Sequence, residues 1–433
     1  MTFAGVIAEY NPLHNGHALL IRDMRRLGAD AVAVVMSGNF VQRGEPAILS
    51  KWARAGQALA CGADLVAELP LPWAVAGAER FALGGVSLLT ALGADVIGFG
   101  SECGDLAKLQ QAQAALASGE LHNAMRALLS KGTTFAAARQ QAVESLFGRE
   151  TAALLREPNN VLGIEYLKAI ERLKSGIKPV TVRRENACIH TGESGELPLT
   201  SSAVRAMMRA GTDVAEFLPE AAYRILAAEA AAGRAPADLS HLGRGPLAIL
   251  RGMDRNAFAC LPDISEEWQA GRAQGGKGPP VRGPLAILRG MDRNAFACLP
   301  DISEGLENRL FAAVQKAGSI PELLRLVKTK RYPMARIRRI ILSALLGIRA
   351  SDAAGTPPYL RVLGIGANGP GILRRAEERK LLPIVSRSAE PDRLGGRAAE
   401  LFRLENRAAD FYALCMPSPG PCGLDRSTKL VLL

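Results

Sequence analysis

The stretch Gly5–His17 reads GVIAEYNPLHNGH, and it decides the fold of the first part of the chain. An apolar run leads into a polar turn, and H-x-G-H then opens a segment of helical periodicity. Backbone N–H groups at such a helix start bind phosphate oxygens, and Gly16 lets the backbone approach closely. Two histidines three residues apart share one helix face, where they can donate hydrogen bonds to departing pyrophosphate. The pattern favours nucleoside triphosphate chemistry, and the alternatives are a zinc pair or two unrelated surface histidines.

The residues after this turn continue an alternation of strands and helices. Strands are expected at 4–8, 31–36, 65–69, 96–100 and 179–184, and helices at 18–27, 52–61 and 79–92. Helices between consecutive strands predict a parallel α/β sheet with its ligands beyond the carboxyl ends of the strands.

The rest of the chain is expected to be mostly helical. Residues 106–175 have helical patterns with a break at 157–160, and helices dominate again from about residue 216. Residues 357–365 read as a strand that enters a glycine-rich loop, whereas the turn-rich segment 417–433 is expected to be loosely held. We therefore predict a domain at 1–215 and a mostly α-helical, basic domain at 216–433.

Composition excludes several classes of protein. The chain has 433 residues, of which 48% are hydrophobic and 22% charged, as in ordinary globular proteins and unlike disordered or collagen-like chains. No apolar run reaches the roughly 18–20 residues of a membrane-spanning helix. The seven cysteines form no C-x-x-C pair, and an odd count cannot pair completely. We expect a cytoplasmic protein with no membrane contact and no obligate protein partner.

Charge is distributed unevenly along the chain. The formal net charge is +11, yet residues 1–105 carry seven Lys/Arg against ten Asp/Glu. Residues 321–350 carry eight Lys/Arg against one Glu, a net of +7. A basic segment behind a slightly acidic first part indicates either a polyanion-binding surface or a solvated helix face.

The chain contains an exact internal repeat. Residues 244–266 recur letter for letter as 282–304, at an offset of 38 residues. At the same offset Glu229 matches Glu267 and 232–235 match 270–273, so we infer a duplicated unit that spans 229–266 and 267–304. Two copies are too few for a solenoid. We interpret the repeat as a tandem duplication tolerated as a surface insertion, and the alternative is a second binding helix.

Several long motifs resemble one family. The H-x-G-H turn is similar to that of the HIGH-motif nucleotidylyltransferase superfamily. The wider set resembles the bacterial tRNA(Met) cytidine acetate ligase family, and its members are Gly5–His17, Val35–Ala47, Gly62–Pro70, Phe99–Glu102, Pro158–Gly163 and Lys328–Tyr332.

This resemblance implies a Rossmann-like nucleotidylyltransferase domain and a two-step reaction. ATP and acetate would give acetyl-adenylate and pyrophosphate. The wobble cytidine of elongator tRNA(Met) would then attack the acetyl group, giving N4-acetylcytidine and AMP. Magnesium is expected to accompany ATP, although no dedicated metal-ligand set is visible.

The residue patterns and this resemblance together indicate positions for the site residues. The catalytic candidates are His14, His17, Asn11, Lys51 and Asp64. The acetate pocket candidates are Ser37, Gly38 and Asn39, which follow a strand. The ATP-binding candidates are Ile7, Ala8, Glu9, Tyr10, Asn11, Pro12, Leu13, His14, Asn15, Gly16, His17, Ala18, Leu19, Leu20, Gly100, Asn159, Asn160, Arg184, Ser201 and Arg205.

The basic segment supplies the tRNA candidates. Its cations can contact phosphates, and Tyr332 can stack on an unpaired base. The alternative is a core stripe formed by Ile337, Ile340, Ile341 and Leu345 with solvated arginines beside it. The tRNA-binding candidates are Lys328, Lys330, Arg331, Tyr332, Arg336, Arg338 and Arg339.

Several of these residues allow two interpretations. Asn159 and Asn160 can bind nucleotide or cap a helix, and so can Ser201 and Ser202. Asp64 and Glu68 can orient a substrate or pair with Lys51 and Arg54. The whole chain can also be a small-molecule adenylyltransferase, or an inactive RNA-binding relative.

Overall fold

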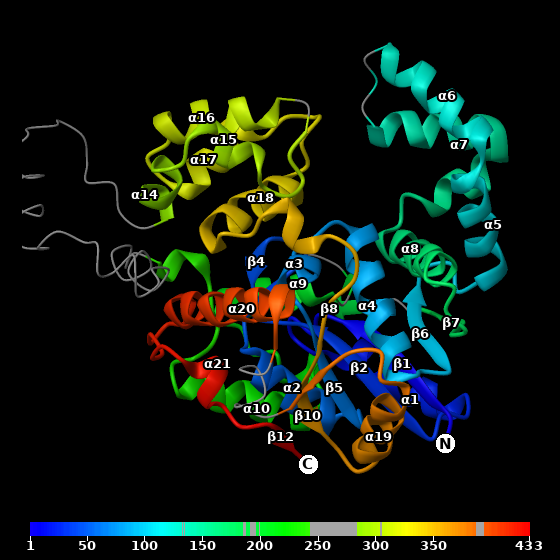
Figure 1. Cartoon of the computed structure of the whole chain (residues 1–433), viewed down its shortest axis with the longest axis vertical. Coiled ribbons are helices and arrows are strands. Elements are labelled where there is room, and N and C mark those ends of the chain that lie inside the picture. The colour runs from blue at the N-terminus through cyan, green and yellow to red at the C-terminus, as the bar shows by residue number, and fades with distance from the viewer. Residues whose placement is uncertain are drawn as a thin grey trace, which may run out of the picture.

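The computed structural model describes residues 1–131, 133, 135–184, 188–190, 196–198, 200–242, 284–303, 305–386 and 394–433. At its centre is an eight-stranded sheet (Figure 1). Its strand order is β11 (Ile384–Val385), β10 (Leu360–Ile365), β5 (Leu65–Leu69), β2 (Ala31–Ser37), β1 (Phe3–Ala8), β6 (Val96–Ser101) and β7 (Lys178–Arg183), with β12 (Val431–Leu432) paired to β10.

The first five long strands, β1, β2, β5, β6 and β7, pair in parallel. This confirms the parallel α/β sheet that the sequence predicts. The strand β10 pairs antiparallel to β5 and so extends the sheet from a distant part of the chain.

Helices cover both faces of the sheet, which explains why β2 is buried along its whole length and apolar from residue 31 to residue 36. Val34 belongs to a core cluster with residues of α1 (Asn15–Arg26) and α2 (Lys51–Ala60). Val35 points the other way, into a cluster with residues of α4 (Ala78–Leu92). Successive strand residues therefore anchor opposite helix layers.

Residues 106–172 form a helical group beside the sheet. It consists of α5 (Leu106–Ala117), α6 (Gly119–Ser130), α7 (Phe135–Leu154) and α8 (Pro158–Arg172). The predicted break at 157–160 is the start of α8, where proline fits because the first helical N–H has no intrahelical partner. The helix α8 packs on α4 and so joins this group to the sheet.

The later part of the chain is mostly helical, as expected. The long helices are α9 (Ser201–Arg209), α10 (Glu220–Ala231), α16 (Leu306–Lys316), α17 (Ile320–Val327), α18 (Met334–Leu346), α19 (Gly369–Arg379) and α20 (Gly396–Cys415). The shorter elements are α3 (Leu71–Ala74), α14 (Pro284–Arg289), α15 (Arg293–Ala297), α21 (Leu424–Ser427), β3 (Phe40–Val41), β4 (Glu45–Pro46), β8 (Cys188–His190) and β9 (Glu196–Pro198). Among the helices of the described residues, none has the length and apolarity to cross a membrane.

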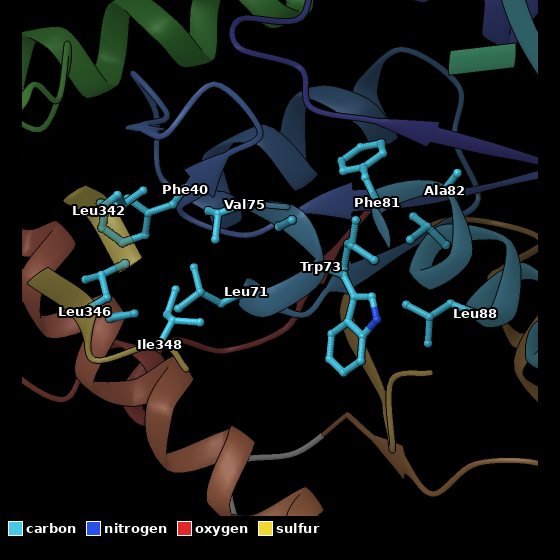
Figure 2. Packing of buried hydrophobic residues seen from close by; sticks show 14 of the residues in the cluster. Phe40, Leu71, Trp73, Val75, Phe81, Ala82, Leu88, Leu342, Leu346 and Ile348 are labelled. Carbon is cyan, nitrogen blue, oxygen red and sulfur yellow. The ribbon is translucent and has the colours of Figure 1, made fainter. Parts of the chain in front are cut away.

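The helices α14–α18 form a group that stands apart from α5–α7 in Figure 1. Apolar side chains pack this group of helices against the domain that contains the sheet. Figure 2 shows Leu342 and Leu346 of α18 beside Phe40, with Leu71 and Ile348 next to them. All five belong to one core cluster, so α18 is fixed against the loops that follow β2 and β5.

The expectation of a loosely held segment 417–433 is wrong. Asp425 is buried and forms ion pairs with Lys51 and Arg361, and β12 pairs in parallel with β10. The strands β10, β11 and β12 come after residue 216, yet they belong to the same sheet as the strands before it. The domain boundary at that position stays a prediction.

The second copy of the repeat is part of the core. Leu285 and Leu288 of α14 are buried, as are Phe296 and Leu299 in and after α15. They share a cluster with residues of α16 and α18. Most of the first copy lies outside the described residues, so its interpretation as an insertion stays a prediction.

We expect deletion of residues 267–304 to leave the fold intact. The identical residues 244–266 would then take the place of 282–304 in the core. Because closing a shorter loop costs less entropy, the midpoint of thermal unfolding should stay the same or rise slightly. Circular dichroism during heating measures this, and a deletion variant that fails to fold would show that the first copy has a place of its own.

Candidate active site

The histidine turn lies at the carboxyl end of β1, where α1 begins. His14 is the N-cap of α1, and its Nδ1 accepts a hydrogen bond from Gly16 N–H at 3.1 Å. Nδ1 of His17 accepts from His14 N–H at 3.3 Å, and the two rings stack with centroids 3.8 Å apart. Since Nδ1 is an acceptor in both neutral rings, the proton of each ring is on Nε2. The turn thus holds two Nε2–H donors side by side.

Both imidazoles are neutral at physiological pH. Burial lowers the pKa of His14 to about 4, with a smaller contribution from the charge of Arg184. Burial also lowers the pKa of His17 well below its usual value, helped by His14 and Arg184. A neutral imidazole keeps one N–H donor, so each ring can still donate a hydrogen bond to developing negative charge.

These two histidines should make the fold sensitive to acid. The folded pKa of His14 is lower than the unfolded value of 6.5, so stability is complete above about pH 6.5 and falls as the pH approaches 4. The contribution of His14 is on the order of 3 kcal/mol. His14→Asn keeps a capping side chain but removes this titration, and should flatten the loss. Urea unfolding at pH 7 and pH 4.5 tests this, and equal pH dependence in both proteins would contradict it.

A second group of site residues, beside the histidine turn, comes from the ends of β6 and β7 and the start of α8. Glu102 accepts hydrogen bonds from the backbone N–H groups of Asn159 and Asn160 at 3.2 and 2.8 Å. It also accepts from Nδ2 of Asn159 at 2.6 Å, while Oδ1 of Asn159 accepts from Arg184 Nη1 at 3.1 Å. The structure therefore brings Asn159 and Arg184 together. Asn160 is buried and its Oδ1 accepts from Cys103 N–H, so it supports the loop.

The position of Gly100 follows from the same group of residues. A Cβ placed at residue 100 would lie 2.9 Å from Cγ of Arg184. Glycine at this position thus leaves room for the stem of Arg184. Passage of adenosine over Gly100 stays a prediction.

A third group of site residues comes from α9. Thr200 caps this helix through a hydrogen bond from Ala203 N–H to its Oγ1 at 3.1 Å, so the hydroxyl of Ser201 is not needed as a cap. Arg205 is buried and donates to the backbone oxygen of Asn11 at 2.7 Å. Its Nη2 also donates to Ser202 Oγ at 3.3 Å. The charge of Arg205 is thereby tied directly to the histidine turn.

Unpartnered polar atoms gather around this turn. Among the buried side-chain atoms without a hydrogen bond are the Tyr10 hydroxyl, Asn11 Nδ2, Ser37 Oγ and Arg205 Nε. Asn11 Oδ1 accepts from Ile48 N–H at 2.9 Å, so the residue is held while its amide nitrogen stays available. Buried polar atoms are rarely left unpaired, and such a group indicates a place where a polar ligand binds.

The loop at 37–39, proposed from the sequence as the acetate pocket, is held by several hydrogen bonds. The buried guanidinium of Arg54 donates to the backbone oxygens of Ser37, at 3.0 Å, and Gly38, and to that of Glu9. Asn39 Oδ1 accepts from Lys51 N–H at 2.8 Å. Arg54 and Glu102 were not among the site residues proposed from the sequence. For Glu102 the signal was present, because it directly follows the carboxyl end of β6.

Two of the expected catalytic residues are held in ion pairs. Lys51 is buried, with Nζ 2.8 Å from Glu68 and 2.6 Å from Asp425, so Glu68 forms the ion pair that was one of its two possible roles. Asp64 directly precedes β5, so it lies at the amino-terminal ends of the parallel strands, whereas the histidines lie at their carboxyl-terminal ends. Its carboxylate pairs with Arg25 at 2.5 Å. It also accepts from Val32 N–H at 2.8 Å. These contacts correct the expectation that Asp64 takes part in chemistry.

The tRNA candidates divide into two groups. Lys328, Lys330, Arg331 and Arg338 are exposed. Arg336 and Arg339 instead hold the loop before α16, through the backbone oxygen of Asp301 and its carboxylate at 2.9 and 2.7 Å.

The structure corrects the expectation for Tyr332 and confirms the core stripe of α18. Tyr332 is buried, with the guanidinium of Arg336 5.7 Å from its ring centroid, so in this structure its ring does not offer a face to a base. The stripe is confirmed because Ile337, Ile340, Ile341 and Leu345 are all buried. Within the described residues, no group of three or more His, Cys, Asp or Glu side chains is placed to hold a metal ion.

Comparisons with known proteins agree with this geometry. The family model described as HIGH Nucleotidyl Transferase matches residues 1–270 and 285–423. The tRNA(Met) cytidine acetate ligase of Thermoanaerobacter sp. (strain X514) is 33% identical, and the match covers 100% of each chain. That of Caldanaerobacter subterraneus subsp. tengcongensis is 36% identical over 96% of this chain and 95% of the relative.

A solved structure extends the comparison to the fold. The crystal structure of Thermotoga maritima TmcAL bound with alpha-thio ATP matches with a TM-score of 0.83 and 30% identity, over 100% of both chains. Sequence and fold therefore agree along the whole length, and the chain belongs to the tRNA(Met) cytidine acetate ligase family of HIGH nucleotidyl transferases.

Proposed function

We propose that this protein is an ATP-dependent ligase that activates acetate and acetylates the wobble cytidine of elongator tRNA(Met) to N4-acetylcytidine. The observation that carries the proposal is the stacked pair of neutral histidines at the start of α1, each with a free Nε2–H. The names of the relatives, and the ATP analogue bound to the Thermotoga protein, support the choice of substrates.

In the first step an acetate oxygen attacks the α-phosphorus of ATP, and the bond to pyrophosphate breaks. Nε2–H of His14 and His17 would donate to the charge that develops on the departing pyrophosphate. Arg184 and Arg205 stand on two sides of this turn and would add positive charge. The product is acetyl-adenylate, which needs no nucleophile from the enzyme.

In the second step the exocyclic amine of cytidine attacks the acetyl carbon, and AMP leaves. This amine is a weak nucleophile, so its position relative to the adenylate should dominate the rate. The exposed cations Lys328, Lys330, Arg331 and Arg338 would bind the RNA backbone near α18.

Magnesium would enter with the phosphates of ATP. The described residues offer no cluster of metal ligands, and we assign no step to a protein-bound metal. Acetate would lie near Ser37, whose buried Oγ has no hydrogen-bond partner.

One assay separates the candidate functions. The protein is incubated with ATP, magnesium and radiolabelled acetate, with elongator tRNA(Met), with another tRNA, or with no RNA. Label in elongator tRNA(Met) supports the ligase. Acetate-dependent pyrophosphate exchange without labelled RNA would place the protein among small-molecule adenylyltransferases. Without exchange in any arm, an inactive RNA-binding relative would remain.

A further inference from the structure

A short hairpin links the histidine turn to α18. Its strands are β3 and β4, which pair through Phe40 with Pro46 and Val41 with Glu45. The three residues between them form a tight turn closed by Gly44 N–H to Val41 O at 2.9 Å. Gly44 has φ +75°, as three-residue hairpins require at this position.

On one side the hairpin is bound to the ATP site. Gln42 N–H donates to the Glu9 carboxylate at 2.7 Å, directly after β1. Glu45 accepts from Arg205 Nη2 at 3.1 Å, and Arg205 in turn holds the Asn11 backbone. Glu9 and Arg205 therefore connect the hairpin directly to the turn that begins α1.

On the other side the hairpin is packed against α18. A Cβ at Gly44 would lie within 2.9 Å of three atoms of Arg338 and Arg339, so the two backbones are in direct contact. Phe40 packs beside Leu342 (Figure 2), and its ring lies 5.9 Å from that of Tyr412. These contacts leave the tip of the hairpin little freedom.

Arg43 is at this tip. Its side chain is exposed, and among the described residues no hydrogen bond or ion pair holds its guanidinium. Burial raises the pKa of Glu9 and lowers that of Arg205. The positive charge of Arg43 is close enough to offset part of the first shift and to add to the second. It thus lies between the residues of the proposed ATP site and the exposed Arg338 of α18.

We propose that Arg43 binds a backbone phosphate of the RNA next to the target cytidine and so positions the amine over the acetyl-adenylate. This inference rests on the proposed function. Guanidinium groups bind phosphate through two parallel hydrogen bonds, and phosphate contacts set the register of a nucleic acid on a protein. In the proposed function the ATP phosphates would face Arg184 and Arg205, whereas an exposed cation on a hairpin tip suits a large polyanion that arrives from solution.

Three variants test the inference. Arg43→Ala removes the phosphate contact, and Arg43→Lys keeps the charge but not the paired donors. Arg379→Ala is the control, because Arg379 is an exposed arginine on α19 that lies far from the hairpin. It is beside Gly93, near the amino-terminal end of β6. Each is assayed for acetate-dependent pyrophosphate exchange without RNA, for kcat/KM with elongator tRNA(Met), and for tRNA affinity against salt concentration.

We expect Arg43→Ala to lower kcat/KM for tRNA by roughly 10- to 100-fold, as for loss of a hydrogen bond to a charged group. The slope of log affinity against log salt should fall by about 0.7. Acetate-dependent pyrophosphate exchange by Arg43→Ala should change far less than its kcat/KM for tRNA. The kcat/KM of Arg43→Lys should be intermediate, and that of Arg379→Ala should match the wild type. An equal loss of exchange would assign Arg43 to ATP instead, and behaviour like that of Arg379→Ala would refute the contact. If the wild type binds and acetylates no tRNA, the proposed function fails as well.

Discussion

Replacing His17 with asparagine should lower acetate-dependent pyrophosphate exchange by about 10²- to 10³-fold, the usual effect of losing one oxyanion donor. The Asn side chain has its oxygen near the position of Nδ1, so it can still accept from His14 N–H. It places no donor near the position of Nε2. The turn should therefore keep its shape while the departing pyrophosphate loses a hydrogen bond.

The matched variant is His17→Gln, whose amide nitrogen reaches the position of Nε2. If a hydrogen bond from the position of Nε2 to pyrophosphate drives the reaction, His17→Gln should retain more exchange activity than His17→Asn. Single-turnover adenylate formation and the ATP dissociation constant separate chemistry from binding. If both variants lose activity equally while binding ATP normally, an Nε2 donor is not the contribution of His17.

Replacing Lys51 with methionine should lower the free energy of unfolding by about 3–5 kcal/mol, because it breaks a buried ion cluster. Lys51 contacts Glu68 and Asp425, and Arg361 contacts the same two carboxylates at 3.5 and 2.6 Å. Without the ammonium group, two buried carboxylates share one guanidinium. Chemical denaturation monitored by fluorescence measures the loss.

The comparison variants separate stability from catalysis. Lys51→Met combined with Asp425→Asn should recover part of the lost stability, since one buried charge is removed with its partner. Arg224→Ala breaks the exposed pair with Glu220 and should cost less than about 1 kcal/mol. Exchange by the Lys51 variant should fall only in proportion to its folded fraction. A stable but inactive Lys51→Met protein would restore the catalytic assignment.

Local patterns in the sequence predicted the elements that carry their own signal. The strand β2 is an unbroken apolar run, and the H-x-G-H turn marks the start of α1, so both are placed within a few residues. Thr200 is followed by apolar residues at helical spacing, and it caps α9. Asp64 was misassigned although it precedes its strand, a position that already indicates the edge away from the ligands.

Contacts between distant residues could not be predicted in this way. Arg205 and Asn11 are 194 positions apart, and no local pattern indicates that they meet. The burial of Tyr332 depends on how α18 packs against its neighbours. Arg43 belongs to a recognisable motif, but its place between two sites follows from the hairpin that carries it.

The ion cluster that joins Lys51 to Asp425 also bears on how the chain folds during synthesis. Ribosomes deliver Lys51, Glu68 and the first five parallel strands long before Asp425 and Arg361 emerge. Until then Lys51 lacks one of its two carboxylates, and β5 presents an open edge where β10 will pair. The nascent first half should therefore depend on chaperones, and the sheet should become protease-resistant only after translation has passed residue 425.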